Sequence, residues 1–211
     1  DQPTPKEPEI ATTATDDADG DKLVKPAAEV KVKDTVVYTN LIAGKSYTMK
    51  GQLIKKSDKS VVAEAETTFT AAESGNGTVE LIFTFDAGKL AGESAVAFEK
   101  CYEGEEVVAK HEDLNDADQT VEITKPEVEI SKTDAATSKE LPGATLIVKD
   151  AEGNEVITWV STSTPRKIKL APGEYTLTEV TAPKGYEVAE TINFKVNEDG
   201  LVGSEKVERS R

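Results

Sequence analysis

The feature that most constrains the fold is an alternation of apolar and polar residues in many short runs. A clear example is Val30-Lys-Val32-Lys-Asp34-Thr-Val36-Val-Tyr38. A period of two places alternate side chains on opposite faces of a half-buried strand. Turn sequences such as Ala43-Gly-Lys and Glu73-Ser-Gly-Asn-Gly separate the runs, and no long helical period competes with them. Short strands at this spacing predict an all-β fold of the β-sandwich type.

The pattern restarts once, at Lys125-Pro126, which predicts two tandem domains over 1–125 and 126–211. The polar stretch 14–28 is expected to be a loop, and residues 1–8 a linker. We expect strands in the first domain over residues 29–38, 46–54, 61–69, 78–85, 95–98 and 119–123. Those of the second domain are expected over 128–133, 145–149, 156–160, 174–179 and 191–196.

The charge balance excludes several classes of partner. The chain carries 40 acidic against 25 basic residues, a net charge of −15. Nucleic acids and anionic membranes bind basic surfaces, so we expect neither as a partner. No apolar run reaches the roughly 18 residues of a membrane span, so we expect no membrane insertion. The composition suits a solvated surface protein, which we expect to be a monomer.

Metal, cofactor and disulfide chemistry are not expected. Cys101 is the only cysteine, so no internal disulfide can form, and we interpret it as a small buried hydrophobe. His111 is the only histidine, which leaves no histidine pair for catalysis or zinc. Asp17-Ala-Asp19-Gly-Asp21 spaces its carboxylates like a calcium loop but lacks the rest of that motif, and we interpret it as a solvated acidic loop.

Four motifs in the first domain occur in a characteristic order. They are Ile10-Ala-Thr12-Thr-Ala, Val32-Lys-Asp34-Thr-Val-Val-Tyr38, Val96-Ala-Phe-Glu99 and His111-Glu-Asp-Leu-Asn-Asp-Ala-Asp-Gln119-Thr-Val. Together they resemble the Thr–Gln ester domains, or VaFE-type repeats, of Gram-positive surface adhesins. The resemblance implies an internal ester with Thr12 as nucleophile and Gln119 as electrophile. It also implies that Asp34, Glu99 and His111 assist.

The residue types suit this chemistry if the fold brings them together. A hydroxyl and a primary amide react poorly in water, but fixing both in one core can supply roughly 7–11 kcal/mol of the barrier. A neutral histidine can move the proton, and one carboxyl of a close buried pair can stay protonated and donate to the amide oxygen. Which of Asp34, Glu99 and His111 acts as base or acid stays open. Alternation does not show that Glu99 points inward.

The second domain carries a different set of motifs. They are Ile130-Ser-Lys132-Thr-Asp134, Glu140-Leu-Pro-Gly-Ala144, Pro172-Gly-Glu-Tyr-Thr-Leu-Thr-Glu179, Thr181-Ala-Pro-Lys-Gly-Tyr186 and Ile192-Asn-Phe-Lys-Val196. This set resembles the SpaA/CnaB prealbumin-like modules of pilins and adhesin stalks. The resemblance implies an isopeptide-forming Lys132 assisted by Glu179. The implied Asn or Asp partner lies beyond the turn at 197–200, and no such residue follows Asp199, so the partner stays unidentified.

The two resemblances imply a structural stalk segment of an adhesin on the extracellular, wall-anchored surface of a Gram-positive bacterium. The implied partners are neighbouring stalk domains of the same polypeptide, with a host ligand met through other domains. One alternative is a host-ligand-binding module, although Trp159, the only tryptophan, lies in a strand-like run where core packing is expected. The other alternative is an amidase that turns over many substrate molecules. The resemblance disfavours it, because it implies a nucleophile that is consumed by its own product.

Overall fold

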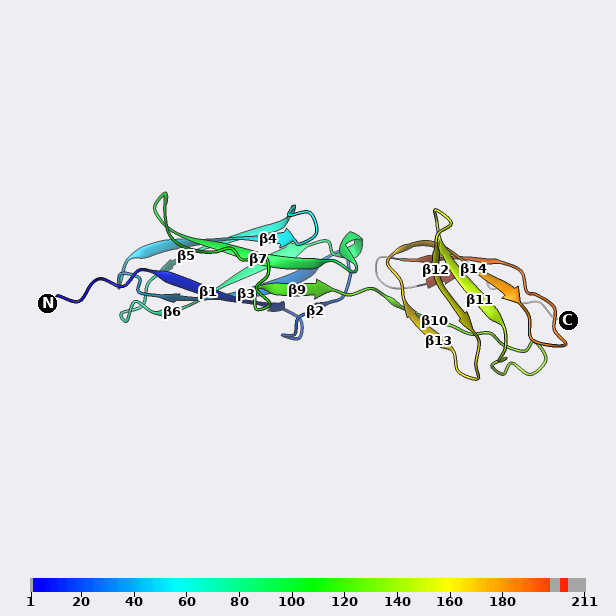
Figure 1. Cartoon of the computed structure of the whole chain (residues 1–211). Coiled ribbons are helices and arrows are strands. Elements are labelled where there is room, and N and C mark those ends of the chain that lie inside the picture. The colour runs from blue at the N-terminus through cyan, green and yellow to red at the C-terminus, as the bar shows by residue number, and fades with distance from the viewer. Residues whose placement is uncertain (1, 198–201, 205–211) are drawn as a thin grey trace. The chain divides into compact units, whose positions relative to one another are not determined.

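The computed structural model describes residues 2–197 and 202–204, which fall into two compact units, Asp1–Thr124 and Lys125–Arg211 (Figure 1). The described residues form strands and turns, with one 3-10 turn, η1 (Gly88–Leu90), as their helical element. The prediction of an all-β fold with two sandwich domains is confirmed. No helix in the described ranges is long and apolar enough to cross a membrane.

Two sheets form the first unit. The three-stranded sheet has the order β1-β3-β6, and the six-stranded sheet has the order β2-β9-β7-β4-β5 with β8 paired to β7. The strands of the smaller sheet are β1 (Glu9–Asp16), β3 (Val30–Thr39) and β6 (Gly77–Phe85). Those of the larger sheet are β2 (Leu23–Val24), β4 (Ser46–Lys55), β5 (Val61–Thr70), β7 (Ser94–Glu103), β8 (Glu106–His111) and β9 (Thr120–Ile123).

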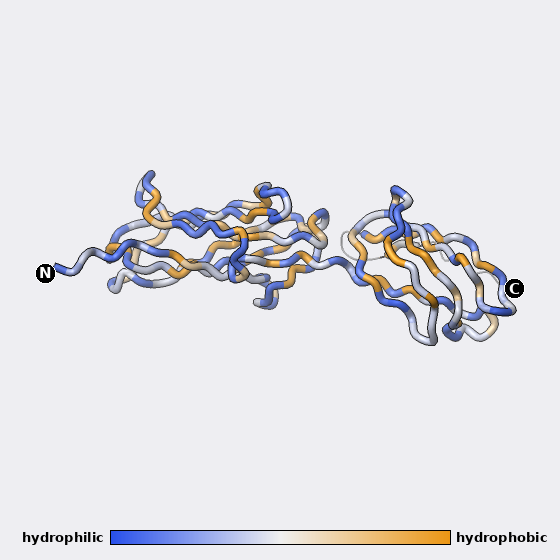
Figure 2. The backbone as a smooth tube through the Cα atoms, viewed as in Figure 1, coloured by the Kyte–Doolittle hydropathy of each residue, from blue (hydrophilic) through white to orange (hydrophobic). Residues whose placement is uncertain are grey.

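The core of this unit lies between the two sheets, because alternate residues of each strand face inward. In Figure 2 hydrophobic and hydrophilic residues alternate along the strands, as a period of two requires. Among the fully buried side chains are Met49, Leu53 and Phe83. Gly51 lets these layers approach closely, since a Cβ there would come within 2.7 Å of the Phe83 ring. Gly51 also lies directly opposite Glu99 in the β4–β7 pairing.

The prediction of a loop over 14–28 is wrong at two places. β1 continues to Asp16, and Leu23 and Val24 form β2, which pairs in parallel with β9. The end of β1 is too polar, and β2 too short, to show an apolar–polar alternation in the sequence. Both segments are strands because they pair with β3 and β9. The sequence prediction also lacked β8, although its pairing with β7 places His111 opposite Glu99.

The second unit also has two sheets. A pair, β10-β13, consists of β10 (Glu127–Ile130) and β13 (Arg166–Lys169), and a five-stranded sheet has the order β12-β11-β14-β15-β16. Its strands are β11 (Thr145–Asp150), β12 (Glu155–Val160), β14 (Gly173–Thr181), β15 (Ile192–Val196) and β16 (Val202–Ser204). Trp159 packs against the small core around Val148 and Phe194, as the sequence interpretation expected.

Candidate functional site

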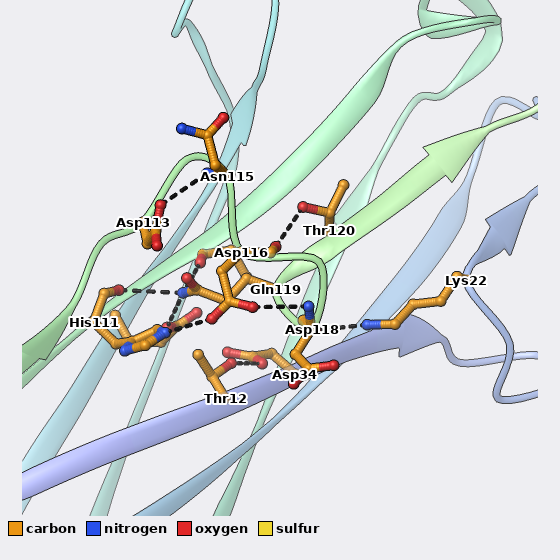
Figure 3. Close-up of polar contacts among 12 residues, drawn as sticks. Thr12, Lys22, Asp34, His111, Asp113, Asn115, Asp116, Asp118, Gln119 and Thr120 are labelled. Atoms are coloured by element: carbon orange, nitrogen blue, oxygen red, sulfur yellow. Dashed lines mark hydrogen bonds and ion pairs between the residues drawn. The ribbon is translucent and has the colours of Figure 1, made fainter.

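Four polar side chains lie inside the core of the first unit. Asp34, Glu99 and Gln119 have no exposed surface, and Thr12 is 5% exposed. Buried charged and amide groups at this density are uncommon unless they are paired or functional. The four come from segments far apart in sequence, and Figure 3 shows Thr12, Asp34, Gln119 and His111 converging on one place.

Strand register brings Thr12 and Asp34 together on the smaller sheet. In the β1–β3 pairing, Thr12 lies opposite Val36 and Ala14 lies opposite Asp34, so Thr12 and Asp34 are diagonal neighbours on the inward face. The Thr12 hydroxyl donates a hydrogen bond to Asp34 Oδ1. The hydroxyl therefore already contacts a group that can accept its proton.

The Gln119 carboxamide is held from the opposite sheet. Its Nε2 donates to Ala97 O at 2.5 Å, to Glu99 Oε2 at 3.2 Å and to His111 O at 3.3 Å. Two of these partners are backbone carbonyls, which only accept, so they fix which end of the amide is nitrogen. Gln119 Oε1 has no donor among the described residues. The amide is thus anchored by its nitrogen, while its oxygen is left without a partner.

Glu99 and Asp34 form a close carboxyl pair across the two sheets. Burial raises the pKa of Glu99, and a hydrogen bond to Asp34 and the negative charge of Asp34 raise it further. Glu99 therefore stays protonated at neutral pH and donates to Asp34. Asp34 Oδ2 and Glu99 Oε1 have no hydrogen-bond donor among the described residues, which fits a proton held between the two carboxyl groups.

His111 reaches the site through two contacts. Its backbone oxygen accepts from Gln119, and its ring Nε2 lies 2.8 Å from Asp116 Oδ2. The bond to His111 lowers the pKa of Asp116, and a second bond from Asp118 N lowers it further. Asp116 is therefore an ionised acceptor, which places a proton on His111 Nε2.

Asp116 is a site residue that the sequence interpretation missed. It lies inside the His111–Gln119 motif, but its role depends on the turn closing. The Asp116 carboxylate accepts from Asp118 N at 2.9 Å, and its backbone oxygen accepts from the Thr120 hydroxyl at 2.7 Å. Both bonds fix the turn that delivers Gln119. An aspartate three residues before Gln119 was the available signal.

The five residues expected to act in the first domain are thus brought together, and their arrangement suits one kind of chemistry. A hydroxyl bonded to a carboxylate lies beside a carboxamide, with a protonated carboxyl contacting the amide nitrogen. These are the elements of nucleophilic acyl transfer: a nucleophile with its base, and a leaving group with its acid.

The second unit holds a separate pair. Lys132 Nζ lies 3.4 Å from Glu179 Oε2, and Glu179 also accepts from Ala189 N at 2.5 Å. Glu179 is 4% exposed, and its Oε1 has no partner among the described residues. Asn197 follows β15, while Asp199 lies outside the described residues. Lys132 and Glu179, the two residues expected here, are therefore in contact. Among the described residues, no Asn or Asp side chain is found bonded to Lys132 that could be its isopeptide partner.

Two other expectations concern single features. Cys101 is fully buried, as expected of a small hydrophobe. In the acidic loop the carboxylate oxygens of Asp16, Asp19 and Asp21 lie within 4.8 Å of one another. Each also accepts a backbone N–H two residues further on. These local turn bonds account for the conformation of the loop.

Comparison with known families and structures agrees with this geometry. Residues 8–123 match the family model of the T-Q ester bond containing domain, and residues 126–210 match the SpaA prealbumin-like fold domain. No curated protein matches the chain significantly.

Three solved structures are similar. One is a Mobiluncus mulieris adhesin described as containing disulfide, isopeptide and ester cross-links. In space group P21 it is 20% identical over 83% of this chain and 81% of its own, with a TM-score of 0.58. Its P1 form is 20% identical over 93% and 96%, with a TM-score of 0.59. The pilin BcpA of Bacillus cereus is 17% identical over 92% and 67%, with a TM-score of 0.37. The first two share the fold of this chain.

Proposed function

The chain belongs to the family of T-Q ester bond containing domains over residues 8–123, and from this membership we propose that Thr12 and Gln119 condense into an internal ester. The observation that carries the proposal is the buried contact of the Thr12 hydroxyl with Asp34, beside a carboxamide whose nitrogen is held by carbonyl groups. The bond would join β1 to the segment that leads into β9.

The contacts suggest a route for the proton. Asp34 accepts the hydroxyl proton as Thr12 Oγ1 attacks Cδ of Gln119. Glu99 contacts both Asp34 and the amide nitrogen, so its own proton can pass to Nε2 as Asp34 becomes protonated. The Oγ1–Cδ bond forms, the Cδ–Nε2 bond breaks, and the hydroxyl proton is balanced by the proton that leaves with ammonia.

In this scheme His111 and Asp116 assist from the other side of the amide. The Asp116 carboxylate holds the ring through Nε2, and the His111 backbone oxygen holds the leaving nitrogen. The pair therefore keeps the scissile bond in place.

The consequence would be mechanical. Thr12 and Gln119 are 107 residues apart, so unravelling the enclosed chain would lengthen the protein by about 350–390 Å. With the ester formed, tension entering at β1 passes to β9 through a covalent bond, and the strands between them carry none of it. A domain held only by packing and hydrogen bonds is marginally stable. The bond thus suits a segment under load.

We assign the protein to the stalk of an adhesin or pilin on the extracellular surface of a bacterium, with neighbouring domains of the same polypeptide as its partners. The solved adhesin from Mobiluncus mulieris has this fold across most of its length and is described as containing ester and isopeptide cross-links. The chemistry consumes its own nucleophile, so the role is structural and the reaction occurs once per molecule. Anchoring to a cell wall is part of this proposal.

Intact mass is the test. The wild-type protein, denatured before measurement, should weigh one ammonia less than its sequence. Thr12→Val should have the full mass, whereas the neighbouring exposed Thr13→Val should keep the deficit. A wild-type mass equal to that of the sequence, in folded material, would contradict the proposal.

A second bond, an isopeptide from Lys132 assisted by Glu179, is a further candidate. The favouring observation is the contact of Lys132 with a buried carboxyl that also has an unpartnered oxygen. Proteolytic separation of the two units before mass analysis would assign any additional loss of ammonia or water to the second unit. Lys132→Met should remove that loss, and a second unit of full mass would exclude the bond in this chain.

A further inference from the structure

Lys22 is a half-buried lysine whose ammonium group lies between the two segments that carry the ester partners. Its Nζ donates to Ala14 O and to Asp118 O, each at 2.6 Å. Ala14 follows Thr12 by two residues on the same inward face of β1, and Asp118 immediately precedes Gln119. Figure 3 shows the Lys22 side chain reaching the Asp118 backbone beside Asp34.

One carbonyl lies in a strand of the smaller sheet, and the other lies in the turn that leads into the larger sheet. Ala14 lies in β1 of the three-stranded sheet, and Asp118 lies in the turn before β9 of the six-stranded sheet. The backbone adds one bond at the same point, from Ala14 N to Asp118 O at 2.8 Å. Lys22 doubles this connection with charge-assisted bonds, which are stronger than bonds between neutral groups.

The setting of Lys22 differs from that of lysines paired at the surface. Lys45 and Lys55 bind the carboxylates of Glu103 and Asp58, and these hydrogen bonds raise the pKa of each lysine. Burial instead lowers the pKa of Lys22, while the charges of Asp118, Asp34 and Asp116 oppose that effect. The Lys22 ammonium group is thus partly desolvated and interacts with the negative charge of Asp34, the carboxylate that contacts Thr12.

From this geometry we propose that Lys22 is a positioning residue for ester formation. It holds the Thr12 strand against the Gln119 turn and keeps a cation beside Asp34. The inference rests on the proposed ester. It adds that the reaction needs the Lys22 ammonium group, from the connection between β1 and β2, as well as the buried groups of the core. The reason is that β1 and the turn before β9 must be fixed together for Thr12 and Gln119 to meet in a reactive geometry.

The first experiment follows ester formation in time. Freshly synthesised chain collected in denaturant is refolded by dilution, and the loss of one ammonia is followed by intact mass. We expect Lys22→Met to lower the rate about ten-fold or more, since small misplacements of reacting groups have effects of that order. Lys22→Gln, which keeps a donor without the charge, should also be slower than wild type. The matched control is Lys25→Met, at an exposed lysine of the same segment.

A chemical rescue separates positioning from a role in folding. Lys22→Cys is prepared together with Cys101→Ala, so that the introduced thiol is the only one in the protein, and is folded before it reacts with bromoethylamine. The reaction restores an ammonium group at nearly the length of lysine. Circular dichroism establishes that the protein was folded beforehand. We expect ester formation to accelerate after the alkylation, without any refolding step.

The outcomes are distinct. Lys22→Met and Lys22→Gln reacting at the wild-type rate would overturn the role of Lys22 while leaving the ester itself established. A folded Lys22→Cys protein that reacts at full rate before alkylation would do the same. Wild type and Lys25→Met that never lose ammonia would overturn both the ester and the inference built on it.

Discussion

Replacing Thr12 by valine should lower the thermal stability of the first unit substantially. Valine keeps the shape of threonine in a strand but has no hydroxyl, so no ester can form. If the ester acts like a disulfide on the unfolded chain, closing a loop of about 100 residues stabilises by roughly 4.7 kcal/mol. For a unit of this size that corresponds to a decrease in Tm of roughly 15–25 °C.

A second unlinked variant separates the bond from local effects. In Thr12→Val the Gln119 carboxamide remains, and its nitrogen keeps the bonds to backbone carbonyls that ester formation would remove with the ammonia. Gln119→Leu removes the ester too, but keeps the Thr12 hydroxyl and its bond to Asp34, which ester formation would remove. The decrease that the two variants share is the contribution of the bond.

The assay is thermal unfolding followed by circular dichroism, with intact mass recorded on the same samples. Thr13→Val, at the adjacent exposed position of β1, is the control for β-branched substitution and should unfold within a few degrees of wild type. If wild type carries the ester and both unlinked variants nevertheless unfold at the same temperature as Thr13→Val, the loop-closure argument is wrong.

Three further outcomes follow from individual contacts. In unlinked Thr12→Ala protein the raised pKa of Glu99 means that the folded unit retains a proton which the unfolded chain loses above about pH 4.5. The contribution of this proton to the free energy of unfolding should therefore be fully present below that pH and decrease above it, by up to about 1.4 kcal/mol per pH unit. Urea titrations should show a smaller decrease for Glu99→Gln. Asp116→Asn should slow ammonia loss, because it weakens the bond to the His111 ring. Glu112→Gln, which removes an ion pair with Lys100, should not slow it. If both variants lose ammonia at the same rate, Asp116 has no part in the reaction. Lys132→Met should destabilise the second unit by on the order of 3 kcal/mol, because it leaves the buried Glu179 unpaired, and denaturant unfolding should show no such loss for the exposed Lys139→Met.

The sequence predicted the fold class because inward and outward residues alternate so regularly. It did not place a strand at β1 or at β2, which pair with β3 and β9. β8 was also missed, since its residues are largely exposed or half-buried and lack a strong alternation.

The reacting groups could be anticipated only through motifs. Alternation alone left the direction of Glu99 undecided, and the structure buries its side chain completely, on the strand position opposite Gly51. Lys22 contacts backbone carbonyls of two distant segments, which no residue pattern reveals, whereas Asp116 at least lies inside the motif that ends at Gln119. Long-range contacts of this kind, such as the 96 residues between Lys22 and Asp118, become visible only in the folded chain.

The most direct test of the ester is tandem mass spectrometry of a complete digest of folded wild-type protein. We expect one branched peptide in which the segment containing Thr12 is joined to the segment containing Gln119, with the mass of both less one ammonia. Recovery of the two segments only as separate peptides, each of full mass and with Gln119 intact, would contradict it.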